Sequence, residues 1–169
     1  MKIKNVVVAL LILFFSCQKD VAVNKNDKVI APISDQVLET AVIYEANIRQ
    51  YSKEGTFKAF TKDIPVLKEL GVKVIWLMPI NPISEVKRKA TDGTFTSEIE
   101  DEEERKKYLG SYYSVSDYKA INPEFGNKDD FKALIATAHN NGIYVIVDWV
   151  PNHTGWDHPW ITAHPEWYT

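Results

Sequence analysis

Two long apolar runs constrain the fold of this chain more than any other feature. Residues 72–78 (VKVIWLM) and 143–150 (IYVIVDWV) are almost continuously apolar, and each run ends at a proline, Pro79 or Pro151. Strands of this kind are typical of parallel sheets that are buried on both faces. The sequence therefore predicts a parallel sheet whose two faces are both covered.

An amphipathic helix is predicted before each apolar run. The two apolar stripes at helical spacing are Phe57, Phe60, Ile64, Leu67 and Leu70, and Phe131, Leu134, Ile135 and Ala138. Gly71 and Gly142 end these helices, and Asn127 caps the second one. Pro65 leaves two alternatives for the first helix: a kink, or a new helix that begins after Asp63 with the proline in its first turn.

A third strand is predicted over residues 40–46 (TAVIYEA), which precede the first helix. The order is then strand, helix, strand, helix, strand, which is typical of right-handed βαβ units and of the α/β class. A chain of 169 residues can hold one domain. It is too short for a closed eight-unit barrel, which needs about 250 residues.

The connection between residues 79 and 127 is far longer than the ~2–6 residues usual in such units. Residues 97–107 form a charge run and are predicted to be an exposed helix or a mobile loop, whereas the aromatic residues 109–126 are predicted to be ordered. Because this connection leaves the sheet at the carboxyl ends of the strands, it lies where ligands bind in parallel α/β folds.

Composition excludes several classes of function. The single cysteine cannot form an intrachain disulfide or a multi-cysteine metal cluster. The net charge of −3, with no stripe of Lys and Arg, predicts no nucleic-acid partner. A zinc site built from His153, Asp157, His158 and His164 is rejected because the spacing matches no dedicated ligand pattern.

The amino terminus has the pattern of an export signal. The apolar run 6–15 would span about half of a ~30 Å hydrocarbon core, so residues 1–16 are predicted to be a signal peptide rather than a membrane-spanning helix. Cys17 follows this run directly, which resembles a bacterial lipoprotein signal; the alternative is a free thiol in an ordinary signal peptide. We expect lipid attachment at Cys17, a tether over residues 17–36, and an outer-membrane lipoprotein at the periplasmic or cell-surface face.

The chemistry-bearing residues cluster after the last apolar run. Asp148 ends an apolar strand and needs polar partners there, either in a binding site or as a cap of loop amides. His153 could bind a ligand hydroxyl or a loop carbonyl. Four tryptophans follow closely, and one or two of them are expected to face a ligand, because indoles stack on sugars; they are Trp149, Trp156, Trp160 and Trp167.

Three motifs carry a family resemblance: residues 71–82 (GVKVIWLMPINP), 110–126 (GSYYSVSDYKAINPEFG) and 142–155 (GIYVIVDWVPNHTG). In this order they resemble the α-amylase family of glycoside hydrolases (family 13), over about residues 40–157. The resemblance implies a (β/α)8 TIM barrel of which only the first three strands and their helices are present. Residues 37–150 would then be the amino-terminal part of the catalytic barrel, and residues 151–169 the start of a second domain inserted after the third strand.

The resemblance also implies roles for individual residues. Asp148 and His153 would hold hydroxyls of the sugar beside the cleaved bond, and Tyr113 would stack on that sugar. Tyr112 replaces the glycine that is usual in the family, so the two tyrosines could be exchanged. Asn152 matches a position that helps to bind a structural Ca²⁺, for which its amide oxygen is a suitable ligand.

The implied activity is retaining hydrolysis of starch or maltooligosaccharides, with an α-glucan as the partner. It requires a carboxylate nucleophile and a carboxylic acid about 5–5.5 Å apart. The family carries its catalytic groups on later strands, so no residue of this chain, including Glu45 and Asp148, is assigned to them. We expect the amino-terminal portion of a longer enzyme, and a 169-residue product that folds poorly and hydrolyses nothing.

Two other hypotheses remain open from the sequence. One is a non-catalytic, surface glycan-binding lipoprotein that uses the aromatic tail, in which replacement of Trp156 and Trp160 abolishes binding. The other is a compact three-layer α/β domain unrelated to sugars.

Overall fold

The computed structural model describes residues 30–169. The predicted signal peptide, Cys17 and most of the predicted tether lie outside these residues. The described chain has three strands, β1 (Val42–Ala46), β2 (Val72–Leu77) and β3 (Tyr144–Val147). They form one parallel sheet in the order β1-β2-β3, which confirms the α/β prediction.

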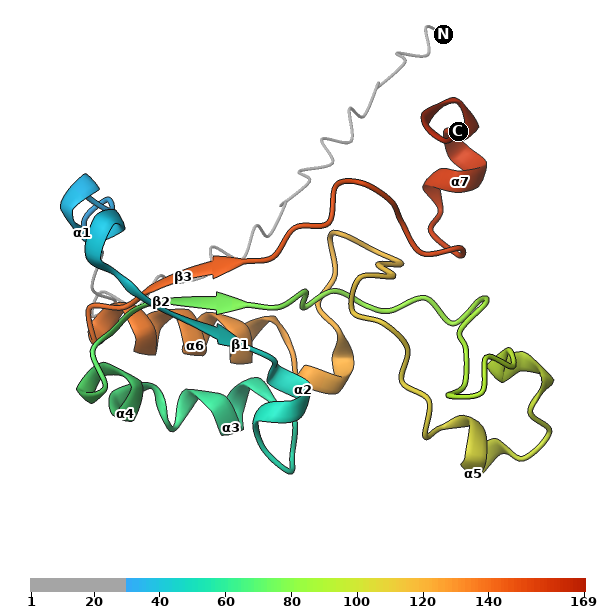
Figure 1. The fold of residues 1–169 in the computed structure, drawn as a ribbon, viewed down its shortest axis with the longest axis horizontal. Coiled ribbons are helices and arrows are strands. Elements are labelled where there is room, and N and C mark those ends of the chain that lie inside the picture. Colours follow the sequence, from blue (N-terminus) through green and yellow to red (C-terminus); the bar gives the residue numbers. More distant parts are fainter. Residues whose placement is uncertain (1–29) are drawn as a thin grey trace, which may run out of the picture.

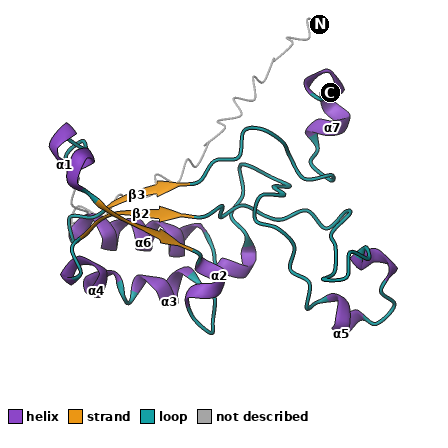
Figure 2. Ribbon diagram, in the orientation of Figure 1, coloured by secondary structure: helices purple, strands orange, loops and turns teal. Residues whose placement is uncertain are grey.

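Three of the helices between the strands pack on one side of the sheet (Figures 1 and 2). They are α3 (Phe57–Thr61), α4 (Ile64–Glu69) and α6 (Lys128–Asn140). A doubly wound sheet reverses its strand order and carries helices on both faces, whereas a (β/α) barrel keeps the chain order and places its helices outside. The described elements therefore have the arrangement of part of a (β/α)8 barrel.

The core lies between this helical layer and the sheet. Phe57, Phe60 and Leu134 are fully buried there, and Ile75 of β2 meets them from the sheet. The Phe57 ring packs edge-on against Phe125, with the ring centroids 5.8 Å apart. Burial of these apolar surfaces is the main stabilising contribution to this part of the fold.

The opposite face of the sheet is open among the described residues, so the prediction of two covered faces is wrong. Ile43, Trp76 and Ile146 on this face are 55%, 36% and 46% exposed. Strand register places Trp76 beside Ile146. The apolar pattern of the strands indicates burial on both sides, but in a barrel the inner face is covered by side chains of other strands. A run of apolar residues does not encode which element provides that cover.

Helix boundaries settle the alternatives at Pro65. The first amphipathic stripe is divided into α3 and α4, and the proline lies in the first turn of α4 after Asp63. The Asp63 side chain makes no capping bond and instead accepts a hydrogen bond of 3.0 Å from the hydroxyl of Tyr51. Burial, together with this bond, raises the pKa of Tyr51 to about 12.

The remaining boundaries differ from the prediction by a few residues. Asn127 caps α6 in a reciprocal capping box with Asp130, and Gly71 follows α4 with a φ of +86°, as expected for helix ends. The strand predicted from residue 40 begins only at Val42, because a helix that was not predicted, α1 (Asp35–Thr40), precedes it. β3 ends at Val147, earlier than the predicted residue 150.

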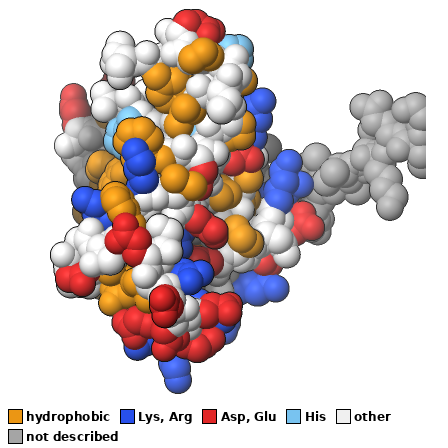
Figure 3. Space-filling model, turned by 90° about the vertical axis from the view of Figure 1, so that its right-hand side faces the viewer, with side chains coloured by type: hydrophobic (Ala, Val, Ile, Leu, Met, Phe, Trp, Pro, Cys, Tyr) orange, Lys and Arg blue, Asp and Glu red, His pale blue; other side chains and the backbone are white. Residues whose placement is uncertain are grey.

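The long connection and the tail extend from the carboxyl ends of the strands (Figure 1). The connection contains η1 (Thr96–Glu98), α5 (Glu102–Arg105) and η2 (Pro123–Phe125), and α2 (Ile48–Tyr51) follows β1. The charge run forms the short, exposed α5, and acidic side chains gather at the lower end of the face in Figure 3, where α5 lies. The tail contains α7 (Trp160–Ala163) and η3 (Pro165–Trp167). Within residues 30–169, no helix has the length and apolarity that crossing a membrane requires.

Candidate functional site

Three of the predicted site residues meet at the carboxyl end of β3. The Asp148 amide donates a hydrogen bond of 2.8 Å to the carbonyl of Leu77, so this residue continues the pairing with β2. The hydroxyl of Tyr113 donates to Asp148 Oδ2 at 3.1 Å. His153 Nε2 lies 3.0 Å from the carbonyl oxygen of Tyr113. Tyr113 therefore joins Asp148 to His153, although 35 residues separate it from the aspartate.

The contacts of His153 define its tautomer. The side-chain amide of Asn152 lies 3.3 Å from His153 Nδ1, and an amide nitrogen can only donate. Nδ1 therefore accepts, and Nε2 donates to the Tyr113 carbonyl, since a carbonyl oxygen can only accept. Of the two partners expected for His153, a ligand hydroxyl and a loop carbonyl, the structure contains the loop carbonyl. The side chain of His153 is nevertheless exposed.

The hydroxyl of Tyr113 is kept protonated at the site. Burial raises its pKa, and the hydrogen bond to Asp148 and the charges of Asp148 and Glu45 raise it further. The neutral phenol donates a hydrogen bond to Asp148 Oδ2. Asp148 therefore presents a carboxylate that is already oriented and can accept hydrogen bonds from hydroxyl groups.

The structure distinguishes the two adjacent tyrosines. Tyr112 packs against the hydrophobic core, and its ring lies under the guanidinium of Arg49, 4.5 Å from the ring centroid. Tyr113 is 39% exposed and contacts Asp148. Of the two, Tyr113 is the one that lies at the candidate site.

Arg49 of α2 was not predicted, yet it ties the long connection to the sheet. Its guanidinium donates to the carbonyls of Gly110 and Leu109 at 3.3 and 3.4 Å and forms an ion pair with Glu124 at 3.2 Å. An arginine in a short helix that follows a strand gives no signal of its own in a single sequence. These bonds hold the segment that carries Tyr113 beside the strand ends.

Tyr118 was also not predicted as a functional residue from the sequence. It holds the loop between Asp148 and His153 by hydrogen bonds. Its hydroxyl lies 2.6 Å from the carbonyl oxygen of Val150 and 2.7 Å from that of His153. A hydroxyl has one proton, so it is shared between these two acceptors. The one available signal was the position of Tyr118 within the same aromatic motif as Tyr113.

The tail is fastened to the connection at Gly155 and Asp157. The Gly155 amide donates to the carbonyl of Val115, and a Cβ at this position would lie 2.5 Å from Cβ of Ser84. Asp157 Oδ2 accepts hydrogen bonds from the amide of Glu85 at 2.8 Å and from the next amide. Burial of Asp157 acts to raise its pKa, but these bonds outweigh it and lower the pKa.

The metal prediction has no support from the described ligands. Across residues 30–169, no group of three or more His, Cys, Asp or Glu side chains could hold a metal ion. Asn152 supplies a single exposed amide oxygen. A Ca²⁺ at this position would need several further oxygen ligands.

An aromatic hollow of about 470 Å³ lies beside the site, in the tail. Its lining includes Asn152 and His153, together with the rings of Tyr118, Trp149, Trp160 and Trp167. Trp149 and Trp167 are 73% and 58% exposed, whereas Trp160 is packed between Tyr118, His158 and Trp167. Trp156, the other candidate for ligand contact, lies outside this hollow.

These three residues place polar groups side by side at one edge of the sheet. A carboxylate, an imidazole and a phenol at the ends of parallel strands can orient hydroxyl groups of a ligand. Retaining hydrolysis also needs a second carboxyl group about 5–5.5 Å from the first. Of the three converging residues, Asp148 carries a carboxylate, and the charge of Glu45 on β1 also acts on Tyr113.

Comparison with known proteins identifies the family of this arrangement. The family model described as "Alpha amylase, catalytic domain" matches residues 22–166. The chain is 36% identical to alpha-amylase SusG of Bacteroides thetaiotaomicron over 108 residues, which are 64% of this chain and 12% of that protein. It is 33% identical over 120 residues to an alpha-1,4-glucan:maltose-1-phosphate maltosyltransferase of Cereibacter sphaeroides, covering 69% of this chain and 19% of the relative.

Solved structures agree with the sequence relatives. An alpha-amylase from Lactobacillus plantarum matches with a TM-score of 0.64 and 43% identity, over 76% of this chain and 27% of that one. A maltogenic alpha-amylase, AmyB, from Thermotoga neapolitana matches with a TM-score of 0.63 and 36% identity over the same shares. These matches overturn the hypothesis of an α/β domain unrelated to this family. The chain spans between 12% and 27% of the lengths of these four relatives, and it belongs to the α-amylase family.

Proposed function

We propose that this chain supplies the amino-terminal part of a retaining α-glucan hydrolase that acts on starch or maltooligosaccharides. The observation that carries the proposal is the convergence of Tyr113, Asp148 and His153 at the carboxyl end of β3, the edge at which barrel enzymes bind substrate. Membership of the α-amylase family supports the α-glucan as substrate class.

In this proposal the three residues bind and orient the sugar. The Asp148 carboxylate and the His153 imidazole hold hydroxyls of the ring beside the cleaved bond, and Tyr113 offers its ring as a stacking surface. The nucleophile and the general acid come from residues outside this chain. Binding of this kind accelerates the reaction to the extent that it is stronger in the transition state than in the ground state.

Steady-state hydrolysis of a maltooligosaccharide by the native protein tests these roles. Asp148→Asn should lower kcat/KM by about tenfold to a hundredfold, because a hydrogen bond to a charged group contributes about 1.5–3 kcal/mol. Asp129→Asn on α6, an equal change of charge at an exposed residue, should leave kcat/KM unchanged. Equal rates for the two variants would refute the assignment.

The 169-residue chain gives a second test of the same proposal. It should release no sugar from a maltooligosaccharide, because it lacks the pair of carboxyl groups described above. Any turnover by the purified chain that is lost in Asp148→Asn would show that this chain itself carries the catalytic machinery.

A lipid anchor is a further part of the proposal. Residues 1–16 would be removed, Cys17 lipidated and residues 17–36 left as a tether on the outer membrane, at its periplasmic or cell-surface face. The support is the position of the single cysteine after a short apolar run. Cys17→Ala should move the protein from the membrane fraction to the soluble fraction; a variant that stays with the membrane contradicts lipid attachment.

The domain division and the cation are proposed from the family. Residues 37–150 would be barrel, and residues 151–169 would begin the second domain, which agrees with the way α7 and η3 project from the sheet in Figure 1. A structural Ca²⁺ would use Asn152 together with oxygen ligands from outside the described residues. Chelation should then lower the Tm of the native protein, and Asn152→Ala should remove that effect.

A non-catalytic glycan-binding lipoprotein is the second candidate, and the aromatic hollow is the observation that favours it. This function predicts saturable binding of maltooligosaccharides with no product formed. Of the two tryptophans favoured by the sequence, Trp160 lines the hollow and Trp156 does not; binding would use the exposed rings of Trp149 and Trp167. Loss of binding in Trp149→Ala but not in Trp156→Ala, with no hydrolysis by the native protein, would favour this function over the first.

A further inference from the structure

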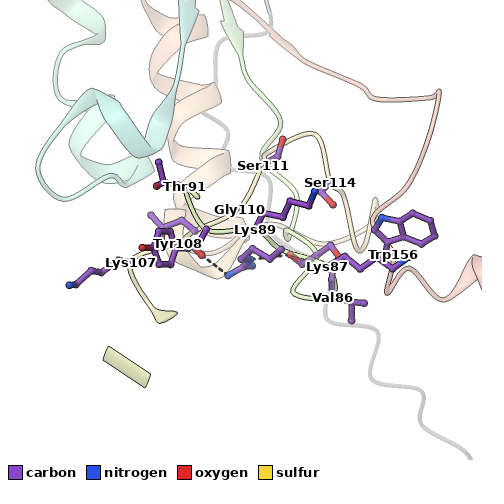
Figure 4. A pocket seen from close by; sticks show the side chains of 14 residues that line it. Val86, Lys87, Lys89, Thr91, Lys107, Tyr108, Gly110, Ser111, Ser114 and Trp156 are labelled. Carbon is purple, nitrogen blue, oxygen red and sulfur yellow. Dashed lines mark hydrogen bonds between the residues drawn. The ribbon is translucent and has the colours of Figure 1, made fainter. Parts of the chain in front are cut away.

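A second hollow, of about 520 Å³, lies in the long connection, away from the residues that meet at Asp148. It is lined by residues 84, 86–91, 107–111 and 114, with Trp156 at one end and Tyr108 at the other (Figure 4). Its lining contains four cationic side chains, Lys87, Arg88, Lys89 and Lys107, and no Asp or Glu, although Lys107 forms an ion pair with Glu104 outside the lining. We call it the basic hollow. Its charge is opposite to the net charge of −3 of the whole chain.

Arg88 is held in this hollow by neutral groups. Its guanidinium donates to the carbonyls of Ser84 at 3.2 Å, Tyr108 at 3.3 Å and Ile83 at 3.4 Å. Gly110 leaves room for it, since a Cβ there would lie 2.9 Å from Arg88 Nε. These carbonyls satisfy three N–H groups and fix the geometry, but they carry no formal charge to neutralise the guanidinium.

The lysines on either side of Arg88 contact aromatic rings instead of acids. Lys87 Nζ lies 3.4 Å from the ring centroid of Trp156, and Lys89 Nζ lies 5.5 Å from that of Phe95. Lys87 has a φ of +56°, a conformation that is uncommon outside glycine. No ion pair in the described part of the chain joins Lys87, Arg88 or Lys89 to a carboxylate.

Three consecutive cations repel one another, and an anion placed among them would relieve that repulsion. Phosphate is well suited, because lysine and arginine form strong charge-assisted hydrogen bonds with its oxygens. The aromatic ends of the hollow can stack on a sugar ring, and its volume is in the range of small-ligand sites. We propose that the basic hollow binds a sugar that carries a phosphate ester, such as a phosphorylated glucose unit of an α-glucan.

The glucan part of this inference rests on the proposed function, but the site does not. The lining of the basic hollow includes none of Tyr113, Asp148 and His153. Asp148→Asn should therefore weaken hydrolysis of maltooligosaccharides and leave binding of a phosphosugar intact. The two proposals can fail separately.

Calorimetric titration of the native protein with glucose 6-phosphate, glucose and inorganic phosphate is the test. Glucose 6-phosphate should bind, glucose should give no saturable heat, and inorganic phosphate should bind more weakly than the ester. The affinity should fall as NaCl is added, because salt screens the charges. Equal binding of glucose and glucose 6-phosphate, or of inorganic phosphate and the ester, would overturn the proposal.

Variants locate the site. Lys87→Gln with Lys89→Gln should weaken binding of glucose 6-phosphate by at least about tenfold, since each lost charge-assisted bond is worth more than a neutral one. Lys132→Gln together with Lys58→Gln, on α6 and α3, makes the same change of charge in the helical layer and should have no effect. Near-ultraviolet circular dichroism shows whether each variant is folded. Folded variants with equal affinities would place the anion elsewhere and overturn the proposal.

Discussion

The helical layer and the long connection are held together in different ways. In the helical layer, Leu134 and Ala138 of α6 bury their side chains fully against the sheet. In the connection, polar side chains reach backbone carbonyls: Asn81 donates to the carbonyls of Asp117 and Ala120 at 3.2 and 3.0 Å. Arg49, Arg88 and Tyr118 do the same at other points. Apolar contact stabilises the first region, and directional bonds shape the second.

The comparison shows where the precision of the site comes from. Hydrophobic burial is non-directional and scales with area, so it stabilises a layer without fixing individual atoms. A hydrogen bond requires a defined distance and angle, but its net contribution is only about 0.5–1.5 kcal/mol. Tyr113 and His153 are therefore positioned mainly by directional hydrogen bonds.

The largest effect is expected in the helical layer. Phe57→Ala should lower the free energy of unfolding by about 3–5 kcal/mol, because it leaves a cavity between the rings of Phe125 and Phe131. Urea denaturation of the native protein measures this loss. Val66→Ala, at an exposed position of α4, is the control and should change stability little. A loss below about 1 kcal/mol in Phe57→Ala would mean that this layer is not the stabilising region.

A smaller effect is expected where the tail meets the connection. Gly155→Ala places a methyl group against Ser84 and should cost about 1–3 kcal/mol. The tail should detach while the helical layer stays folded, so limited proteolysis should cut near residue 155 before it cuts α6. Adding Ser84→Gly removes the closest contact and should restore part of the protection. Simultaneous cleavage of both regions would show that they are one cooperative unit.

Removal of the Tyr118 hydroxyl tests whether the tail can be loosened without an effect on the helical layer. Tyr118→Phe deletes the bond to the carbonyls of Val150 and His153 and should cost about 1 kcal/mol. Amide hydrogen exchange should become faster in residues 150–153 and stay unchanged in α6. Tyr108→Phe serves as the matched control, because the hydroxyl of Tyr108 bonds to the half-buried Glu104 of α5. Uniform acceleration across both regions would contradict a local role for Tyr118.

The smallest effect is a dependence of tail stability on pH. His158 is 5% exposed, its Nδ1 accepts from the amide of Trp160, and burial lowers its pKa below the ordinary value of 6.5. The unfolded chain then takes up a proton first, so stability is complete above about pH 6.5 and falls as the pH drops through that value. Denaturation midpoints between pH 5 and 7.5 should show this slope. His158→Gln should remove this dependence of stability on pH, and His139→Gln on α6 should keep it. Loss of the dependence in His139→Gln alone would assign it to α6 instead of the tail.

The helical layer was the more predictable region from sequence. Apolar spacing located α3, α4 and α6, and glycines and Asn127 located their ends, because these signals are local. Asp148 was also predictable from a local signal, because it is an ionisable residue in an otherwise apolar run. The helix α1 was missed because its residues carry no apolar stripe, and its side chains stay outside the core.

The connection was the less predictable region. Arg49 reaches Gly110, and Asp157 reaches Glu85, over 61 and 72 positions. Such bonds join a side chain to a backbone group, and every residue except proline offers the same backbone groups. A single sequence therefore contains no pairing signal for them. The family resemblance located Tyr113 and His153, but it did not supply the bonds that hold them.

The strand order β1-β2-β3 has a consequence for how this chain is made. Each strand pairs with the one synthesised before it, so every addition to the sheet completes a pairing with material that has already left the ribosome. The entropy lost on closing each crossover grows only slowly with its length, so the long connection before β3 delays that pairing little. The sheet can therefore assemble in the order of translation. In that order β1, α3 and α4 are made first, and β2, α6 and β3 then pack against them.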